Sequence, residues 1–169
     1  MKISLSIKIG IAAGIINCIA WYLIARSLQY YSFGVEQYRY YTTLLLLLFG
    51  ISIAIYLERK QKGGFIEFKD AAKSGILYSL TLSIIISAFS FLYYKFIVPD
   101  AIDFFISEAK KSMIADKIKE ADMPKNIELV TSYFGFFRIF MSTLIMGVIM
   151  SLITGGIFRK KNPHPISLN

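Results

Sequence analysis

Four long apolar runs constrain this chain more than any other feature of its sequence. At about 1.5 Å per helical residue, each run can cross a hydrocarbon core of about 30 Å once its polar ends or a tilt make up the difference. Strands are excluded as isolated spans, because their unpaired backbone groups cannot face lipid. We therefore predict an all-α integral membrane bundle of four transmembrane helices, at about residues 5–27, 38–58, 74–98 and 133–158.

Composition supports a membrane protein. Hydrophobic residues make up 56% of the 169 residues and charged residues 18%, whereas a soluble domain has about 45–50% and about 25%. The net charge of +8 does not indicate nucleic-acid binding, because the basic residues flank the apolar runs as they do in membrane proteins. The first run lacks a small-x-small cleavage site at its exit, so we expect an uncleaved helix and not a signal peptide.

The distribution of basic residues predicts the orientation. Four spans leave both termini on one side of the membrane, together with the connection between the second and third spans. That side carries Lys2, Lys8, Arg59, Lys60, Lys62, Lys69, Lys73, Arg159, Lys160 and Lys161. The other side carries Arg26, Arg39, Lys110, Lys111, Lys117, Lys119 and Lys125, with Lys95 and Arg138 at its span ends, so the bias is modest. Since basic clusters next to span ends mark the cytoplasmic side, we expect cytoplasmic termini and a cytoplasmic tail at 159–169.

Small residues recur every four positions on three of the spans. Lipid provides no hydrophobic force between helices, so close helix packing relies on such residues. The stripes contain Gly10, Gly14 and Cys18, then Gly75, Ser79, Ser83 and Ser87, and finally Gly147, Ser151 and Gly155. We interpret them as packing faces. A polar permeation path lined by the serines is the alternative.

The turn before the third span combines Gly63 and Gly64 with two phenylalanines, Phe65 and Phe68. Two glycines permit a tight turn with positive φ. Both rings share a face with the small-residue stripe of the third span, so we expect a helix from about Phe65 with both rings packed against neighbouring spans. Insertion of the rings into headgroups and docking of a partner are the alternatives.

The connection at 99–132 is expected to be extracytoplasmic and to contain one amphipathic helix. Residues 101–122 lack proline and glycine and place apolar side chains on one face. That face rotates after Ser112, which predicts a bend, and Pro124 is expected to end the helix. The helix either lies solvated against the bundle or docks a partner.

Residues that could carry chemistry are few. Cys18 is the only cysteine and His164 the only histidine, so the sequence offers no metal-ligand cluster and no nucleophile–histidine pair. Acidic residues are absent from the apolar runs themselves, although coupled transporters usually need them at depth. We therefore predict no catalytic, cofactor-binding or metal-binding residue.

The segment 63–75 carries a family resemblance. A basic turn precedes Gly63 and Gly64, an apolar-x-Phe step follows at 66–68, and Ala71, Lys73 and Gly75 lead into the third span as Ala-x-Lys-x-Gly. With the motif formed by Gly147, Ser151, Leu152 and the basic cluster 159–161, this arrangement resembles the domain of unknown function 4199 family. The resemblance implies an inner-membrane protein of Bacteroidetes-type bacteria and no assigned activity.

From these observations we expect a non-enzymatic membrane protein. Its surroundings are the lipid bilayer, with a protein partner in a membrane complex or a second copy of the chain as further contacts. An accessory or assembly subunit is the leading hypothesis. A small transporter or channel acting as an oligomer comes second, and an enzyme third.

Overall fold

The computed structural model describes residues 4–28 and 32–160, and almost all of these are helical. The elements are α1 (Leu5–Ser27), α2 (Phe33–Gln61), α3 (Phe68–Leu92), the π-helical turn η1 (Tyr93–Ile97), α4 (Asp100–Ala115), the 3-10 turn η2 (Glu120–Asp122), α5 (Met123–Tyr133) and α6 (Phe136–Phe158). Within the described residues, four helices are long and apolar enough to cross a membrane: α1, α2, α3 with η1, and α6. The prediction of an all-helical chain with four apolar spans is confirmed.

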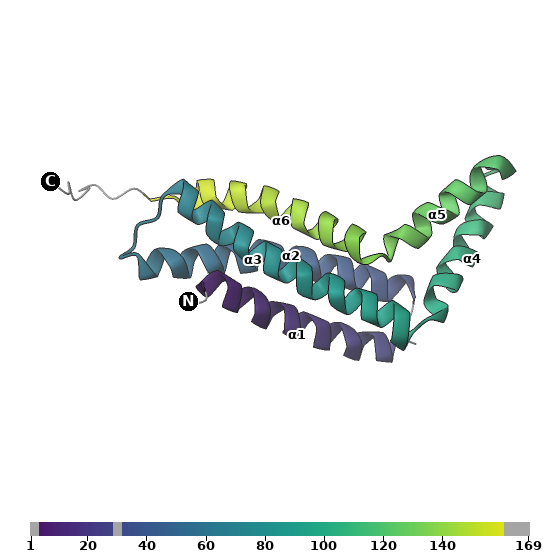
Figure 1. Ribbon diagram of the computed structural model, residues 1–169, viewed down its shortest axis with the longest axis horizontal. Helices are drawn as coiled ribbons and strands as arrows, with labels where there is room; N and C mark the ends of the chain where they lie inside the picture. The colour runs from purple at the N-terminus through teal and green to yellow at the C-terminus, as the bar shows by residue number, and fades with distance from the viewer. Residues whose placement is uncertain (1–3, 29–31, 161–169) are drawn as a thin grey trace.

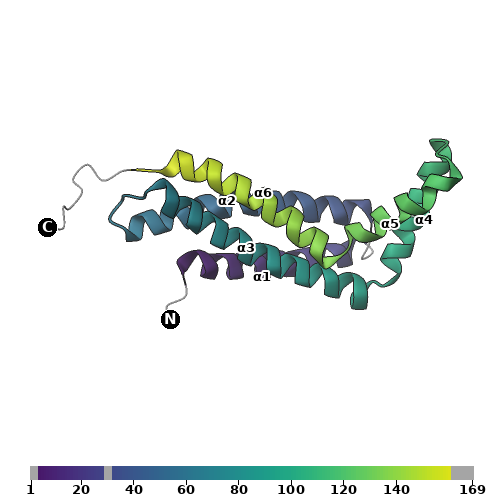
Figure 2. The same cartoon turned by 45° about the horizontal axis from the view of Figure 1, so that its top comes forward.

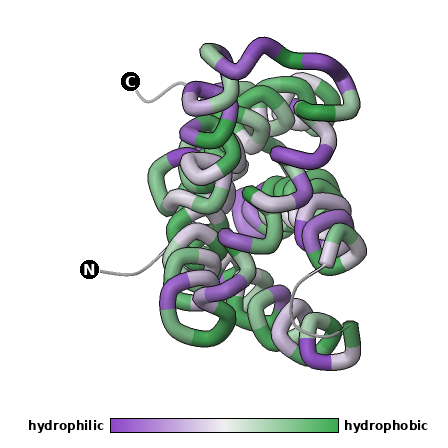
Figure 3. The backbone as a smooth tube through the Cα atoms, turned by 90° about the vertical axis from the view of Figure 1, so that its right-hand side faces the viewer, coloured by the Kyte–Doolittle hydropathy of each residue, from purple (hydrophilic) through white to green (hydrophobic). Residues whose placement is uncertain are grey.

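The four long helices run side by side, and α4 and α5 extend beyond one end of the bundle as a hairpin (Figures 1 and 2). Helix α3 contacts each of the other three long helices, most extensively α6. The hairpin end is viewed directly in Figure 3, with hydrophilic stretches in the hairpin and hydrophobic helices behind it. At the opposite end, residues near each terminus contact the region where α3 begins. The hydroxyl oxygens of Ser6 and Ser74 lie 2.7 Å apart, and the backbone of Lys160 pairs with that of Ile66.

The outer surface of the bundle is apolar, unlike that of a soluble protein. Large apolar side chains on the spans point outward, including Ile16, Phe49, Ile153 and Ile157. The interior instead buries many small polar side chains, among them Ser6, Ser74, Ser79, Ser83, Ser87, Ser90 and Ser151. An extended exposed apolar surface is unfavourable in water but suits lipid, so the bundle has the surface of a membrane protein.

Helices α3 and α6 touch through pairs of small residues. A methyl group added at Gly75 would lie 2.6 Å from the Ser151 hydroxyl, and one added at Gly147 would lie 2.5 Å from the Ser79 Cβ. Side chains larger than hydrogen therefore cannot occupy either position unless the helices separate. Helix α1 approaches α3 a little less closely, because a methyl group added at Gly10 would lie 3.0 Å from Thr81 and one added at Gly14 2.9 Å from Ile85. Gly155 lies against the backbone of Ala72.

Three buried serines of α3 bond to their own helix, whereas Ser90 Oγ is buried without a hydrogen-bond partner among the described residues. The Ser79 hydroxyl donates to the Gly75 carbonyl at 2.8 Å, Ser83 donates to Ser79 at 2.7 Å, and Ser87 donates to Ser83 at 2.6 Å. A serine hydroxyl that bonds to the carbonyl one turn back needs no partner on another helix. The stripe can therefore be buried in an apolar interior without unpaired donors.

The segment between α3 and α6 is not the single helix predicted. Helix α4 ends at Ala115, the chain reverses through Lys117 in a left-handed conformation (φ 54°), and α5 begins at Met123. Pro124 lies in the first turn of α5, so it begins a helix instead of ending one. The reason is that proline lacks only the backbone N–H, which the first turn of a helix leaves unpaired in any case.

The turn before α3 also differs from the prediction. Gly63 and Gly64 do have positive φ, at 75° and 91°, but α3 begins at Phe68 and not at Phe65. Ile66 is extended and exchanges two backbone hydrogen bonds with Lys160, of 3.0 and 2.9 Å, which delays the start of the helix. As a result Ile66 enters the core, whereas Phe68 stays 43% exposed, so its predicted burial is wrong.

Two basic residues brace this turn. The Phe65 ring lies under the Lys160 ammonium, 5.6 Å from it. Lys62 forms an ion pair of 2.6 Å with Asp70, and that hydrogen bond raises the pKa of Lys62. The Lys62–Asp70 pair joins the end of α2 to the start of α3, and the Lys160–Phe65 contact joins the turn to the residue after α6.

We expect Gly147→Leu to separate α3 from α6 and to destabilise the bundle by about 1–3 kcal/mol or more, because overpacking displaces neighbouring side chains or backbone. Gly156→Leu on the same helix is the matched control, since no atom lies within 4 Å of a methyl group added there. Thermal unfolding in detergent measures both variants. Equal midpoints for the two would contradict the packing role of Gly147.

Candidate functional site

A buried ion pair lies near the hairpin end of the bundle, within α2. Glu36 and Arg39 are three residues apart and so lie on one face of the helix. The Arg39 Nε and Nη2 atoms donate to Glu36 Oε2 at 3.0 and 2.8 Å. The Arg39 side chain is only 9% exposed and the Glu36 side chain 13%. The helices extend beyond the apolar runs, so Glu36 and Glu58 fall inside α2 and Asp70 inside α3, and the absence of acidic residues holds only for the apolar runs themselves.

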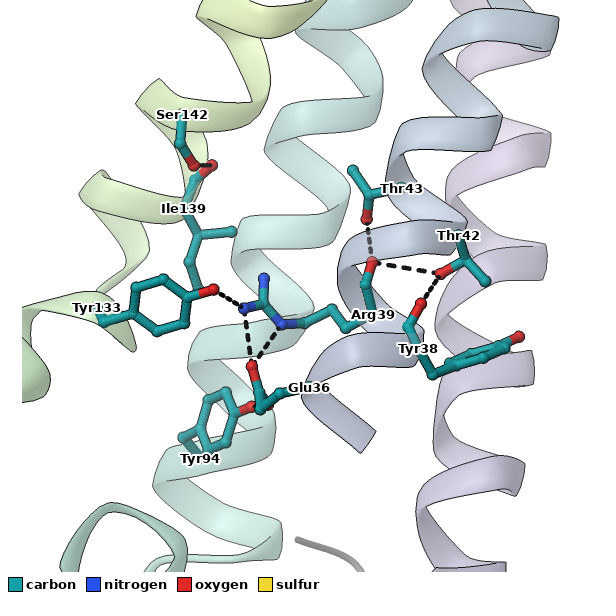
Figure 4. A network of polar contacts seen from close by, with 9 residues as sticks. All are labelled: Glu36, Tyr38, Arg39, Thr42, Thr43, Tyr94, Tyr133, Ile139 and Ser142. Atoms are coloured by element: carbon teal, nitrogen blue, oxygen red, sulfur yellow. Dashed lines mark hydrogen bonds and ion pairs between the residues drawn. The ribbon is translucent and has the colours of Figure 1, made fainter. Parts of the chain in front are cut away.

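Two tyrosines extend the pair into a network across three helices (Figure 4). The Tyr94 hydroxyl, in η1, donates to the second carboxylate oxygen of Glu36. Tyr133, the last residue of α5, accepts a hydrogen bond of 3.2 Å from Arg39 Nη2. The network therefore connects α2 with the end of the third span and with the base of the hairpin.

Aromatic rings enclose the network. Trp21 is fully buried, with its ring centre 5.0 Å from that of Tyr93 and 5.1 Å from that of Phe89. The Arg39 guanidinium lies 5.9 Å from the centre of the Trp21 ring and 5.5 Å from that of Tyr133. Such cation–π contacts partly replace the hydration that the guanidinium loses on burial. The charge is thus held between Glu36 and the Trp21 and Tyr133 rings.

A cleft of about 260 Å³ opens beside the network, between α2 and α6. Its polar wall contains Arg39, Tyr133 and Arg138, and its apolar wall includes Leu47 and Met146. Arg138 is exposed, donates a hydrogen bond of 2.8 Å to the Ser132 hydroxyl and lies 5.9 Å from the centre of the Tyr133 ring. The two guanidiniums therefore lie on the same tyrosine ring at the mouth of one cleft.

The predicted site residues lie elsewhere in the molecule. The glycine and serine stripes form contacts between helices, and the turn at 63–68 is at the far end of the bundle. Cys18 is buried. His164 lies outside the described residues. In the part of the chain that the structure describes, no group of three or more His, Cys, Asp or Glu side chains could hold a metal ion.

Sequence reasoning missed the network and one close packing contact. Arg39 was used only as one of the basic residues that predict the orientation. The Glu-x-x-Arg spacing of Glu36 and Arg39 at the start of a span nevertheless indicates an ion pair. Gly50 also went unnoticed. The Tyr78 hydroxyl donates to the Leu46 carbonyl at 2.9 Å, and an added methyl group at Gly50 would lie 1.9 Å from that hydroxyl oxygen.

Four apolar helices and an apolar outer surface indicate a multi-pass membrane protein of the helical-bundle class. The chain belongs to the family described as Protein of unknown function (DUF4199), whose model matches residues 8–160. No curated protein and no solved structure matches it.

We expect Glu36→Gln to destabilise the bundle by about 3–5 kcal/mol, because Arg39 would then be a buried charge without a counter-ion. The double variant Glu36→Gln, Arg39→Met removes both charges and should recover much of the loss. Thermal unfolding in detergent compares them with Glu128→Gln, an exposed acid on α5. A double variant as unstable as the single one would contradict the pairing.

Proposed function

We propose that this protein is a non-enzymatic accessory or assembly subunit of a complex in the bacterial inner membrane. The observation that carries the proposal is the α4–α5 hairpin, which extends from the bundle on a buried, aromatic base (Figure 1). A projecting element with a firm base and an open apolar groove is suited to holding a partner protein.

The base of the hairpin is packed into the bundle. Ala101 is fully buried, and the Phe105 and Phe134 rings stack with their centres 5.0 Å apart and their planes at 24°. Phe134 also contacts Tyr94 of the buried network, at 4.8 Å between ring centres. The hairpin therefore joins the bundle through the same residues that surround the ion pair.

Away from the base, the hairpin exposes apolar surface. Ile114 is 66% exposed and Leu129 is 50% exposed. An open groove of about 500 Å³ runs between α4 and α5, with Phe33, Ala109 and Val130 among its walls and Glu108 at its side. Amphipathic helices commonly bind in such grooves through an apolar face.

Charge favours a basic partner. Between residues 99 and 132 the chain has seven acidic and five basic residues, although the chain as a whole has a net charge of +8. An acidic surplus beside an apolar groove attracts a segment that is basic and amphipathic. We propose that this segment belongs to another subunit of the complex.

The channel alternative has less support. A conducting path needs polar groups free to replace the hydration of a solute. The hydroxyls of Ser79, Ser83 and Ser87 instead bond to carbonyls of α3.

We propose that the hairpin is extracytoplasmic and both termini cytoplasmic, because Arg59, Lys60, Lys62 and Lys160 gather at the end opposite the hairpin. In a Cys18→Ser background, Ser112→Cys should react in whole cells with a membrane-impermeant maleimide and Lys62→Cys should not. Both positions are exposed. Protection of residue 112 together with labelling of residue 62 would show that the orientation is the opposite of the one proposed.

The partner is tested by photo-crosslinking in native membranes. A photoreactive amino acid at residue 114 or 129 should give a discrete adduct with another protein. The same group at residue 45 or 153, where exposed apolar residues of the spans lie, should give lipid adducts only. Glu108→Lys, which reverses the charge beside the groove, should reduce the protein adduct. Adducts with lipid alone at all four positions would overturn the docking role.

A further inference from the structure

We propose that the cleft between α2 and α6 binds the headgroup of an anionic phospholipid, with the start of an acyl chain on its apolar wall. The site adjoins the hairpin groove, with which it shares Tyr133, but binding there needs no partner protein. The inference rests on an unbalanced positive charge, an unpartnered donor and an apolar wall, all in one cleft of about 260 Å³.

The charge at the mouth of the cleft is unbalanced. Two guanidiniums lie near the Tyr133 ring, that of Arg39 at 5.5 Å and that of Arg138 at 5.9 Å. Glu36 neutralises Arg39, whereas no carboxylate of the described residues lies within ion-pair distance of Arg138. One positive charge therefore remains for an anion to balance.

Arg39 contributes a free donor although its side chain is only 9% exposed. Its Nε and Nη2 atoms bond to Glu36 and Tyr133, while Nη1 has no hydrogen-bond partner among the described residues. This atom points away from Glu36, toward the level of Ile139 and Ser142 on α6 (Figure 4). Both of those residues line the cleft, so the donor is directed at the space a ligand would fill.

The deeper part of the cleft suits a hydrocarbon chain. Leu44, Leu47, Ile139 and Met146 form its apolar lining. Thr43, Ser142 and Thr143 also line the cleft, and the Thr143 hydroxyl, unlike the other two, has no hydrogen-bond partner within the described chain. A glycerol ester next to the phosphate would supply an acceptor for it.

The position of the cleft selects a lipid over a free anion. Arg138 lies in the first turn of α6 and Arg39 in the second turn of α2, so both are near the hairpin end of their spans. Lipid phosphates lie at this depth, and basic pockets between membrane helices bind such headgroups. A free phosphate would use the guanidiniums but leave the apolar lining unoccupied.

Native mass spectrometry of the detergent-solubilised full chain can measure this binding. Phosphatidylglycerol should bind more tightly than phosphatidylcholine, and diacylglycerol, which lacks a phosphate, should bind most weakly. Arg138→Gln should weaken phosphatidylglycerol binding about tenfold, the effect of losing one charged hydrogen bond of about 1.4 kcal/mol. Arg26→Gln is the matched control, an exposed arginine in the last turn of α1 at the same end of the bundle.

Two outcomes of this experiment would overturn the proposal. Equal weakening by Arg26→Gln would mean that phosphatidylglycerol responds only to the overall charge. Competition by inorganic phosphate at the same concentration as the lipid would mean that the site takes a free anion. Unfolding midpoints of the two variants verify that each is folded, and since Arg138 is exposed we expect both to match the unmodified chain.

A second measurement locates the lipid without any substitution. Phosphatidylglycerol with a diazirine in its acyl chain should label peptides that contain Leu47 and Met146, and excess unlabelled phosphatidylglycerol should reduce this labelling more than diacylglycerol does. The groove between α1 and α3, which includes Ile19 and Leu92 and no charged residue, is the internal control. Its labelling should not depend on the headgroup. Equal headgroup dependence at both places would refute the assigned site.

Discussion

The close contact between α3 and α6 is the interaction on which the rest of the structure depends. In lipid, helices gain no free energy by hiding apolar surface from one another, so their association relies on van der Waals contact at short range. The two helices can approach that closely because Gly75 faces Ser151 and Gly147 faces Ser79. Helix α3 then offers its other faces to α1 and α2, and it becomes the centre of the bundle.

The same central helix determines the hairpin end. Its π-helical continuation brings Tyr94 to Glu36, and the start of α6 positions Arg138 beside the cleft. A buried ion pair seldom adds net stability over apolar packing, but it strongly disfavours arrangements that separate its partners. Glu36 and Arg39 therefore specify how α2, the third span and the hairpin base meet, more than how stable the bundle is.

The polar residues divide into two groups with different consequences. The hydroxyls of Ser79, Ser83 and Ser87 are satisfied by their own helix, which allows close packing. The arginines at the cleft are only partly satisfied, because Arg39 Nη1 has no hydrogen-bond partner and Arg138 has no carboxylate partner within the described chain. Unpaired donors next to an apolar wall suit the binding of a ligand with a charged group and a hydrocarbon chain. In this protein they lie in the cleft between α2 and α6.

The sequence by itself determined the helical class and the four spans, because length and hydropathy alone decide whether a segment can cross a membrane. It also indicated the positive φ at Gly63 and Gly64, which depends on local chemistry. Only the tertiary structure decided that Ile66 and not Phe68 enters the core, since backbone pairing with Lys160, 94 residues away, sets the start of α3. It likewise brought Arg39 and Arg138 to one tyrosine ring, a contact between residues of different helices that no local pattern encodes.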